Sequence, residues 1–249
     1  MAPTGLILAM LGAALAIGGW LWRNKPDPPP LARGLSTWAL AFTLVLAGLG
    51  LEFAAQGIPD HAAMAHAAAM ALLLGHGAGL LLLSLSRGRP FASNLGLALT
   101  LGLPPFGAFP GLWLGLQAIQ AALMLLPSLT ALAFAAAALT ALTSWVYAWQ
   151  DGSRPLNTPS SSKRGRWAPI PVMVLAVLAG FLPWIWVLPA QVVAAWLTHE
   201  LPLLLSALGM MLTPVIPGQA SVIPFGLLAV AMALSSIILL VLRLGSRPR

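Results

Sequence analysis

Long runs of apolar residues alternate with short polar segments along the whole chain. Seven of these runs have the length of a membrane-spanning helix, about 20 residues. They cover residues 5–22, 35–56, 62–86, 93–124, 128–149, 168–188 and 222–242. The pattern predicts an all-α fold, a polytopic membrane helix bundle with about seven transmembrane helices. The remaining segment, 189–221, is apolar but contains four prolines, so whether it spans, re-enters or lies on the membrane stays open.

The fourth run is interrupted by a cluster of helix-breaking residues between positions 102 and 113. These residues are Gly102, Pro104, Pro105, Gly107, Pro110 and Gly111. Backbone groups that a break releases inside a membrane persist only where neighbouring helices or a water-filled cavity satisfy them. The cluster therefore predicts one broken helix near 102–113. A proline-kinked helix that serves only in packing is the alternative interpretation.

Composition supports a membrane protein and gives it an orientation. Hydrophobic residues make up 59% of the chain and charged residues 7%, whereas soluble domains contain about 25% charged residues. In a seven-span chain all lysines and arginines fall on one side, which the positive-inside rule places in the cytoplasm. The N-terminus is then outside, the C-terminus is cytoplasmic, and two spans within 189–221 would leave that orientation unchanged. The basic residues are Arg23, Lys25, Arg33, Arg87, Arg89, Arg154, Lys163, Arg164, Arg166, Arg243, Arg247 and Arg249.

The same pattern fixes the expected domain organisation and location. Positive charge lies in short loops and not on a soluble face, so no nucleic acid is expected as a partner. Arg23 and Lys25 follow the first apolar run, whereas a signal peptide carries its charge before the run, so we expect a retained helix. Residues 1–249 form a single integral membrane domain, with a two-helix part at 1–60, a central part at 61–200 and a C-terminal part at 201–249. We expect a multi-pass protein of a bacterial inner membrane.

Few side chains in the apolar runs can carry chemistry. His66 and His76 lie within the third run, and Glu52 lies near the outer end of the second. These three are the candidate residues of a proton path, because a histidine exchanges protons near neutral pH and a retained charge in a membrane is usually functional. The alternative for each histidine is a structural hydrogen bond to a neighbouring helix or carbonyl.

No enzyme site can be assembled from these residues. The sequence contains no cysteine, no recognisable metal or nucleotide motif, and no pairing of a nucleophile with a base. We therefore expect no catalytic residues, no cofactor and no metal, and we do not expect the chain to be an enzyme by itself. A second set of polar residues could line a hydrated path, although such residues more often hydrogen-bond between helices. They are Thr100, Gln117, Gln120, Thr140, Thr143, Ser144 and Tyr147.

Two stretches resemble motifs of one membrane family. Residues 66–78, HAAAMALLLGHGA, are similar to a helix with the pattern H-A-x-x-K-A-L-L-F-L-G-A-G, and residues 102–113, GLPPFGAFPGLW, to a broken helix with G-I-P-P-x-x-G-F-x-G-K-F. Residues 144–149 and 178–184 resemble the following segments in the same order. The family is that of the proton-antiporter-like membrane subunits of respiratory complex I, of multisubunit cation/proton antiporters and of energy-converting hydrogenases. The resemblance covers about residues 60–200, equivalent to the C-terminal half of a full-length member.

This resemblance implies a fold and membership of a larger complex more than it implies proton pumping. Met70 and Leu112 stand where the family pattern has lysines, and those lysines are implied to pass protons along a hydrated axis at mid-membrane. Of the residues that match the motifs, His66 alone could still exchange a proton. We therefore expect a subunit of a proton-translocating NADH/quinone oxidoreductase-like or ion-antiporter complex, as a scaffold or a degenerate proton-path subunit.

The resemblance also implies partners, and two other functions stay open. The expected partners are the lipid bilayer and other membrane subunits of a hetero-oligomeric complex. One alternative is a small stand-alone membrane transporter that binds a neutral substrate at its broken helix. The other is a structural membrane subunit of an unrelated bioenergetic complex.

Overall fold

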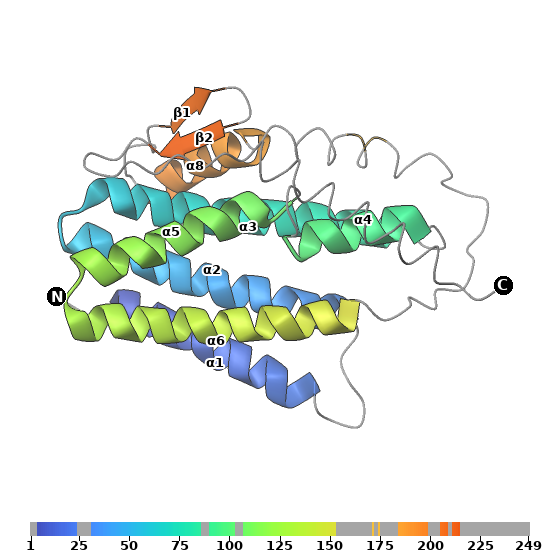
Figure 1. The fold of residues 1–249 in the computed structure, drawn as a ribbon, viewed down its shortest axis with the longest axis horizontal. Helices are drawn as coiled ribbons and strands as arrows, with labels where there is room; N and C mark the ends of the chain where they lie inside the picture. The colour runs from blue at the N-terminus through green and yellow to red at the C-terminus, as the bar shows by residue number, and fades with distance from the viewer. Residues whose placement is uncertain are drawn as a thin grey trace.

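The computed structural model describes the helices, the strands and some of the turns that connect them. The described residues are 4–23, 31–85, 90–102, 107–152, 171, 174, 184–198, 205–208 and 211–214. Within them the chain forms seven named helices and one two-stranded sheet (Figure 1). Their bounds are α1 Thr4–Arg23, α2 Leu31–Ala55, α3 Pro59–Leu85, α4 Pro90–Thr100, α5 Phe109–Leu125, α6 Ser128–Gly152, α8 Trp184–Thr198, β1 Leu205–Leu208 and β2 Met211–Pro214.

Most of the predicted spans are present as helices. The helices α1, α2, α3 and α6 match the first, second, third and fifth apolar runs, and each is long and apolar enough to cross a membrane. The fourth run is divided into α4 and α5, so the prediction of a broken helix is confirmed. Most of 168–188, and all of 222–242, lie outside the described residues.

The segment after residue 184 differs from the sequence-based expectation in two ways. The sixth span was expected to end at 188, but α8 continues through Pro189 to Thr198. A proline removes one backbone donor, and helices in apolar surroundings tolerate that loss where neighbouring groups compensate. Beyond α8, β1 and β2 pair antiparallel with Leu205 opposite Pro214. The all-α class therefore holds for the bundle, and this hairpin is an addition to it.

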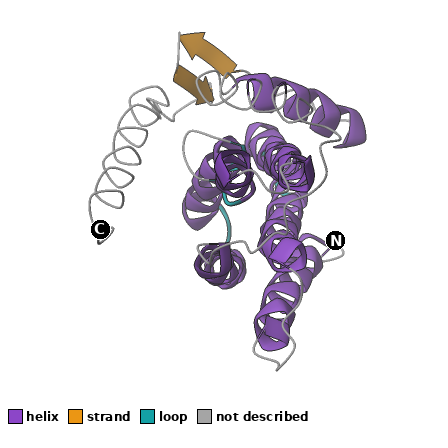
Figure 2. Cartoon of the chain, turned by 90° about the vertical axis from the view of Figure 1, so that its right-hand side faces the viewer, coloured by secondary structure: helices purple, strands orange, loops and turns teal. Residues whose placement is uncertain are grey.

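The helix α3 is the centre of the bundle and packs against α2, α4, α5 and α8. In Figure 1, α8 lies above α3 and α2 lies below it, with α6 and α1 further down. The pairs α1–α2, α1–α6 and α2–α6 all pack together. Figure 2 looks along the bundle and shows the two strands at its edge.

Small residues allow two of these helices to touch through their backbones. A Cβ added at Gly5 of α1 would collide with the Gly48 carbonyl of α2, and one added at Gly48 would collide with the Gly5 carbonyl. In a membrane the association of helices depends on such close packing, because lipid is as apolar as the side chains. The α1–α2 contact is therefore specified by glycine and not by large apolar side chains.

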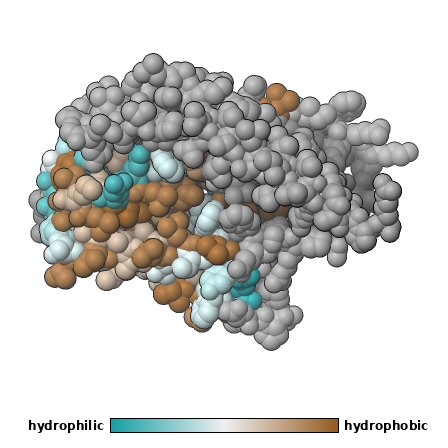
Figure 3. Space-filling view, in the orientation of Figure 1, coloured by the Kyte–Doolittle hydropathy of each residue, from teal (hydrophilic) through white to brown (hydrophobic). Residues whose placement is uncertain are grey.

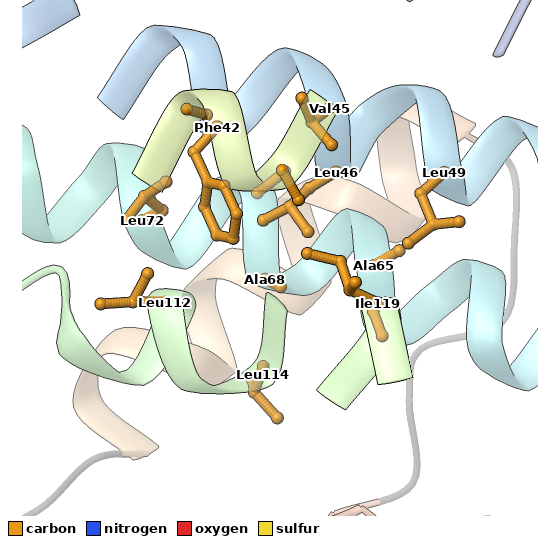
Figure 4. Packing of buried hydrophobic residues seen from close by; sticks show 14 of the residues in the cluster. Phe42, Val45, Leu46, Leu49, Ala65, Ala68, Leu72, Leu112, Leu114 and Ile119 are labelled. Atoms are coloured by element: carbon orange, nitrogen blue, oxygen red, sulfur yellow. The ribbon is translucent and has the colours of Figure 1, made fainter. Parts of the chain in front are cut away.

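The largest buried side chains fill the space between α2, α3 and α5. Figure 4 shows Phe42 and Leu46 of α2 beside Leu72 of α3, with Leu112 and Ile119 approaching from α5. Outside this core, apolar side chains remain exposed on α1, α5, α6 and α8. Figure 3 shows apolar colours over much of the described surface, with hydrophilic colours in smaller patches. An apolar exterior of this kind is what a surrounding bilayer requires.

Two tight turns bring helix ends together at one end of the bundle. After α2, the amide of Gly57 bonds the Ala54 carbonyl and the amide of Ile58 bonds the Phe53 carbonyl, which is a Schellman motif. The helix α5 ends at Leu125, and the next residue, Leu126, is extended because it precedes Pro127. At the opposite end, the guanidinium of Arg23 lies 5.1 Å from the centre of the Tyr147 ring.

Candidate functional site: the broken helix and the buried histidines

The break between α4 and α5 is shorter than the predicted stretch 102–113. It lies between Thr100 and Phe109, and its glycines Gly102 and Gly107 have positive φ values of 62° and 59°. Pro110 is the second residue of α5. A proline fits the first turn of a helix because its missing N–H would have no partner there, so Pro110 starts α5 and does not extend the break.

Three of the predicted helix breakers have other roles or lie outside the described residues. Gly111 is helical, and a Cβ there would lie 2.6 Å from the Cα of Leu72. It therefore permits contact between α5 and α3. Pro104 and Pro105 lie outside the described residues.

The carbonyl groups that the break releases are hydrogen-bonded within the bundle. The Leu99 carbonyl accepts bonds from the amides of Gly102, at 3.2 Å, and Ala108, at 3.1 Å. The Thr100 carbonyl lies 3.0 Å from Nδ1 of His76. The Leu101 carbonyl accepts a 2.6 Å bond from Nε1 of Trp145. Side chains of α3 and α6 thus satisfy backbone groups of the break, as an apolar environment requires.

His76 joins three helices through this arrangement. A carbonyl only accepts, so Nδ1 carries the proton and donates to Thr100, and the neutral ring leaves Nε2 as an acceptor. Nε2 lies 3.4 Å from the hydroxyl oxygen of Ser36 in α2, which is then the donor. The ring also meets the edge of Trp38 at a centroid distance of 5.9 Å. The structural interpretation of His76 predicted a hydrogen bond to a neighbouring carbonyl, and the fold contains that bond.

The backbone of α3 lies directly against the break. A Cβ added at Gly75 would overlap the backbone of Gly107 and Ala108, and one added at Gly79 would lie 2.5 Å from the amide of Thr100. No larger residue fits at position 75 without separating α3 from the break. The hydrogen bond between His76 and Thr100 thus depends on Gly75 and Gly79, which allow α3 to lie this close to the break.

His66 is also buried between α3 and α2, but at another level. A Cβ added at Gly50 of α2 would lie 2.5 Å from Cδ2 of the His66 ring, so the imidazole packs on the glycine backbone. Ten residues separate His66 from His76 on α3, which is about 15 Å along a helix axis. The space between these levels is occupied by the apolar core, including Phe42 and Leu46 (Figure 4). The fold does not bring the two histidines together.

Glu52 is separated from both histidines. It is half-buried in the last turn of α2, and its Oε1 accepts a 3.2 Å bond from the exposed amide of Gln56. Its backbone lies next to Gly5 of α1. Glu52 and Gly50 point about 200° apart around α2, so Glu52 and His66 lie on different sides of that helix. The three candidate proton-path residues therefore form no single cluster.

The two positions at which the resembled motifs have lysines hold apolar side chains in this chain. Leu112 is buried in the core beside Leu72 (Figure 4), and the half-buried Met70 packs against the same core. Insertion of a charge at the middle of a bilayer costs about 2.5–3.5 kcal/mol. Both residues suit the apolar surroundings in which the fold places them.

The hydroxyl groups of the predicted polar set bond within their own helices. Thr140 donates to the Ala136 carbonyl at 2.8 Å, and Ser144 donates to the Ala141 carbonyl at 2.7 Å. Thr100 and Thr143 do the same. The expectation of bonds between helices was wrong for these four residues, because a short hydroxyl reaches the carbonyl three or four positions earlier.

Several residues of this region were missed by the sequence-based reasoning. Ser36 and Trp38 contact His76, and the Thr43 hydroxyl is buried with no hydrogen-bond partner among the described residues. Ser36, Thr43 and Gly50 are seven residues apart, so they share one side of α2. That spacing of small or polar residues in an apolar run was the available signal.

His61 lies just before the third apolar run of the sequence, and the structure places it as the third residue of α3. It is buried, its ring lies 5.4 Å from that of Phe53, and both ring nitrogens lack a hydrogen-bond partner among the described residues. The described residues also contain no group of three or more His, Asp or Glu side chains that could hold a metal ion.

Fold and site together define a class of protein: an apolar helical bundle whose long helices have the dimensions of membrane spans, built around a central helix and a broken one. Comparison with protein-family models, with curated proteins and with solved structures finds no match to this chain.

Proposed function

We propose that this chain is a membrane subunit of a hetero-oligomeric complex of the proton-translocating NADH/quinone oxidoreductase or ion-antiporter kind. Its role there is to serve as a scaffold, with a proton path that has lost its charged residues. One observation supports the proposal: the chain has a broken helix with hydrogen-bonded carbonyls, while Met70 and Leu112 stand at the two positions where the resembled motifs have lysines.

The distribution of polar groups supports a scaffold more than a conductor. His66 and His76 are buried at separate levels of α3, and Phe42, Leu46 and Leu72 pack between those levels. A proton needs a chain of groups or waters that are within hydrogen-bonding distance of one another. Apolar side chains supply no such groups, so the region between the histidines favours packing over conduction.

The same contacts weigh against a transporter that binds a neutral substrate at the break. A substrate site of that type uses free backbone groups at the ends of the half-helices. Here the carbonyls of Leu99, Thr100 and Leu101 already have partners within the chain. We therefore prefer the subunit role, in a bacterial inner membrane with the basic loops in the cytoplasm.

Association with a larger complex is the first point to test. The tagged chain would be purified from its native membrane in mild detergent, and its companions identified by mass spectrometry. We expect redox or antiporter subunits to co-purify in fixed proportion. Recovery of the chain without them, together with solute transport by the chain alone in liposomes, would contradict the proposal.

The scaffold role is tested at His66 within the assembled complex. His66→Gln retains a hydrogen-bonding side chain of similar length but does not titrate, and His66→Ala also removes the ring. We expect the reconstituted His66→Gln complex to pump protons within about twofold of the wild type. A loss of pumping with assembly intact would instead assign His66 to a working proton path. The yield of assembled complex is also compared between His66→Ala and the wild type. A lower yield for His66→Ala measures how much the packing of the ring on Gly50 contributes to assembly.

A further inference from the structure

His61 lies in the first turn of α3, at the end of the bundle where α2 turns into α3. Its ring lies 5.4 Å from that of Phe53, and the two rings are tilted by 46°. Phe53 is fully buried and His61 is only 6% exposed, whereas the preceding residue, Asp60, is exposed. The imidazole therefore lies inside the protein but within one residue of its surface.

The ring of His61 has no hydrogen bonds to the described residues, although both of its nitrogens are buried. His76 differs, because its nitrogens lie within hydrogen-bonding distance of the Thr100 carbonyl and the Ser36 hydroxyl. A neutral imidazole has one donor and one acceptor, whereas an imidazolium has two donors and a positive charge. The site of His61 offers no acceptor to either donor, so the neutral ring fits it better than the charged one.

Few charged groups are available to offset a charge on His61. The helix α3 packs against α2, α4, α5 and α8, and the last three contain no charged or titratable residue within their bounds. Glu52 of α2 already accepts a hydrogen bond from Gln56. Asp60 attracts a proton towards the ring, but its own side chain is exposed. Apart from His61, the charged and titratable residues of α2 and α3 are Arg33, Glu52, Asp60, His66 and His76.

We propose that His61 is a proton-sensitive latch at this end of the bundle. While its ring is neutral, it packs on Phe53 and holds the first turn of α3 against the end of α2. The same turn contains the amide of Ile58 bonded to the Phe53 carbonyl at 2.9 Å, and the amide of Ala62 bonded to the Ile58 carbonyl at 3.1 Å. A proton taken from water gives the ring a charge without a partner, so the turn separates from Phe53 and the imidazolium reaches water. This role does not depend on the proposed subunit function.

Acid therefore opens the latch and base closes it. A ring that has reached water binds a proton more tightly than the packed ring, so each proton bound favours the open form. A histidine in water titrates at about pH 6.5. Above about pH 7.5 both forms are neutral, so the open fraction is constant there. Below about pH 6.5 the open fraction rises by up to about tenfold for each pH unit.

Thiol labelling measures the opening, because the natural chain has no cysteine. Ala62→Cys places a thiol at a fully buried position next to His61, and Gln56→Cys places one in the exposed turn. The full chain in mild detergent would be labelled with dithiodipyridine at pH values on both sides of about 6.5. The rate for Ala62→Cys is divided by that for Gln56→Cys, which removes the pH dependence of the reagent. We expect this ratio to rise by up to about tenfold between about pH 6.5 and 5.5.

Matched variants assign the response to one side chain. His61→Gln keeps a polar side chain that does not titrate, so its labelling ratio should not change with pH. His66→Gln on the same helix and Glu52→Gln at the end of α2 remove other titratable groups, and both should retain the rise.

Hydrogen exchange of the wild-type chain provides a second measurement that needs no substitution. The amides of Ile58 and Ala62 should lose protection below about pH 6.5, relative to amides in the middle of α6. A labelling ratio and a protection that stay constant with pH would overturn the proposal. A pH response that persists in His61→Gln, or that disappears in His66→Gln or Glu52→Gln, would also overturn it, because another group would then be responsible.

Discussion

The imidazole of His76 bonds a carbonyl that the break in the helix has released. Its Nδ1 donates to Thr100 at the end of α4, and its Nε2 faces the Ser36 hydroxyl of α2. One side chain thus connects the central helix with two neighbours. A buried carbonyl left without a partner costs about 1–3 kcal/mol, so His76 has a reason to be retained that does not involve proton transfer.

Replacement of His76 tests this role. We expect His76→Ala to lower the free energy of unfolding by about 1–3 kcal/mol, because the Thr100 carbonyl loses its donor. His76→Asn is the matched variant, since the asparagine amide offers a donor close to the position of Nδ1, and it should lose less. Denaturant unfolding in mild detergent, followed by circular dichroism, measures both. Equal losses for the two variants would show that the ring's volume, and not its hydrogen bond, is what matters.

At the scale of the element, the broken helix depends on backbone conformations that few residues adopt. Gly107 has φ 59°, and a Cβ there would overlap the backbone of Leu99. The same approach allows the amide of Ala108 to bond the Leu99 carbonyl across the break. The direction in which α5 leaves α4 is therefore set by a contact that only glycine permits.

A pair of glycine substitutions separates this requirement from helix propensity. Gly107→Ala is expected to destabilise the protein by more than about 1–2 kcal/mol, the cost of left-handed backbone for a residue with a Cβ, because the collision with Leu99 adds to it. Gly77→Ala on α3 is the control. Position 77 is helical with open space around it, so alanine there should be neutral or stabilising by about 0.5–1 kcal/mol. Thermal unfolding of the two variants in detergent checks this difference, and equal midpoints would contradict it.

At the scale of the whole molecule, charged residues of the described helices lie near the ends of the bundle. Glu52 and Gln56 lie near the turn from α2 to α3, and Arg23 lies beside Tyr147 at the other end. The apolar length between these ends matches a bilayer. The positive-inside rule then predicts that the Arg23 end faces the cytoplasm.

Labelling of single cysteines tests this orientation. Gln56→Cys, at an exposed turn, should react with a membrane-impermeant maleimide added to intact cells. Ser160→Cys, in the basic loop predicted by the sequence, should react only after the cells are opened. The reverse pattern would show that the chain is inserted the other way round. Labelling of both positions after lysis serves as the control for reactivity.

The sequence by itself determined where four long helices of the described chain lie and where the fourth apolar run breaks. Those features depend on neighbouring residues: the length of an apolar run, the turn at Gly57, and the prolines and glycines around position 107. The break itself is shorter than the stretch 102–113, because Pro110 belongs to the first turn of α5. Interactions between residues close in the sequence determine these features, so most of them can be predicted from the sequence.

Tertiary structure alone decided which residues meet. His76 and Thr100 are 24 positions apart, and Trp145 and Leu101 are 44 apart, and no local pattern pairs them. The same holds for the packing of His66 on Gly50. These contacts depend on how the helices rotate and slide against one another. Composition constrains that arrangement only weakly, because every helix in the bundle is apolar on most of its surface.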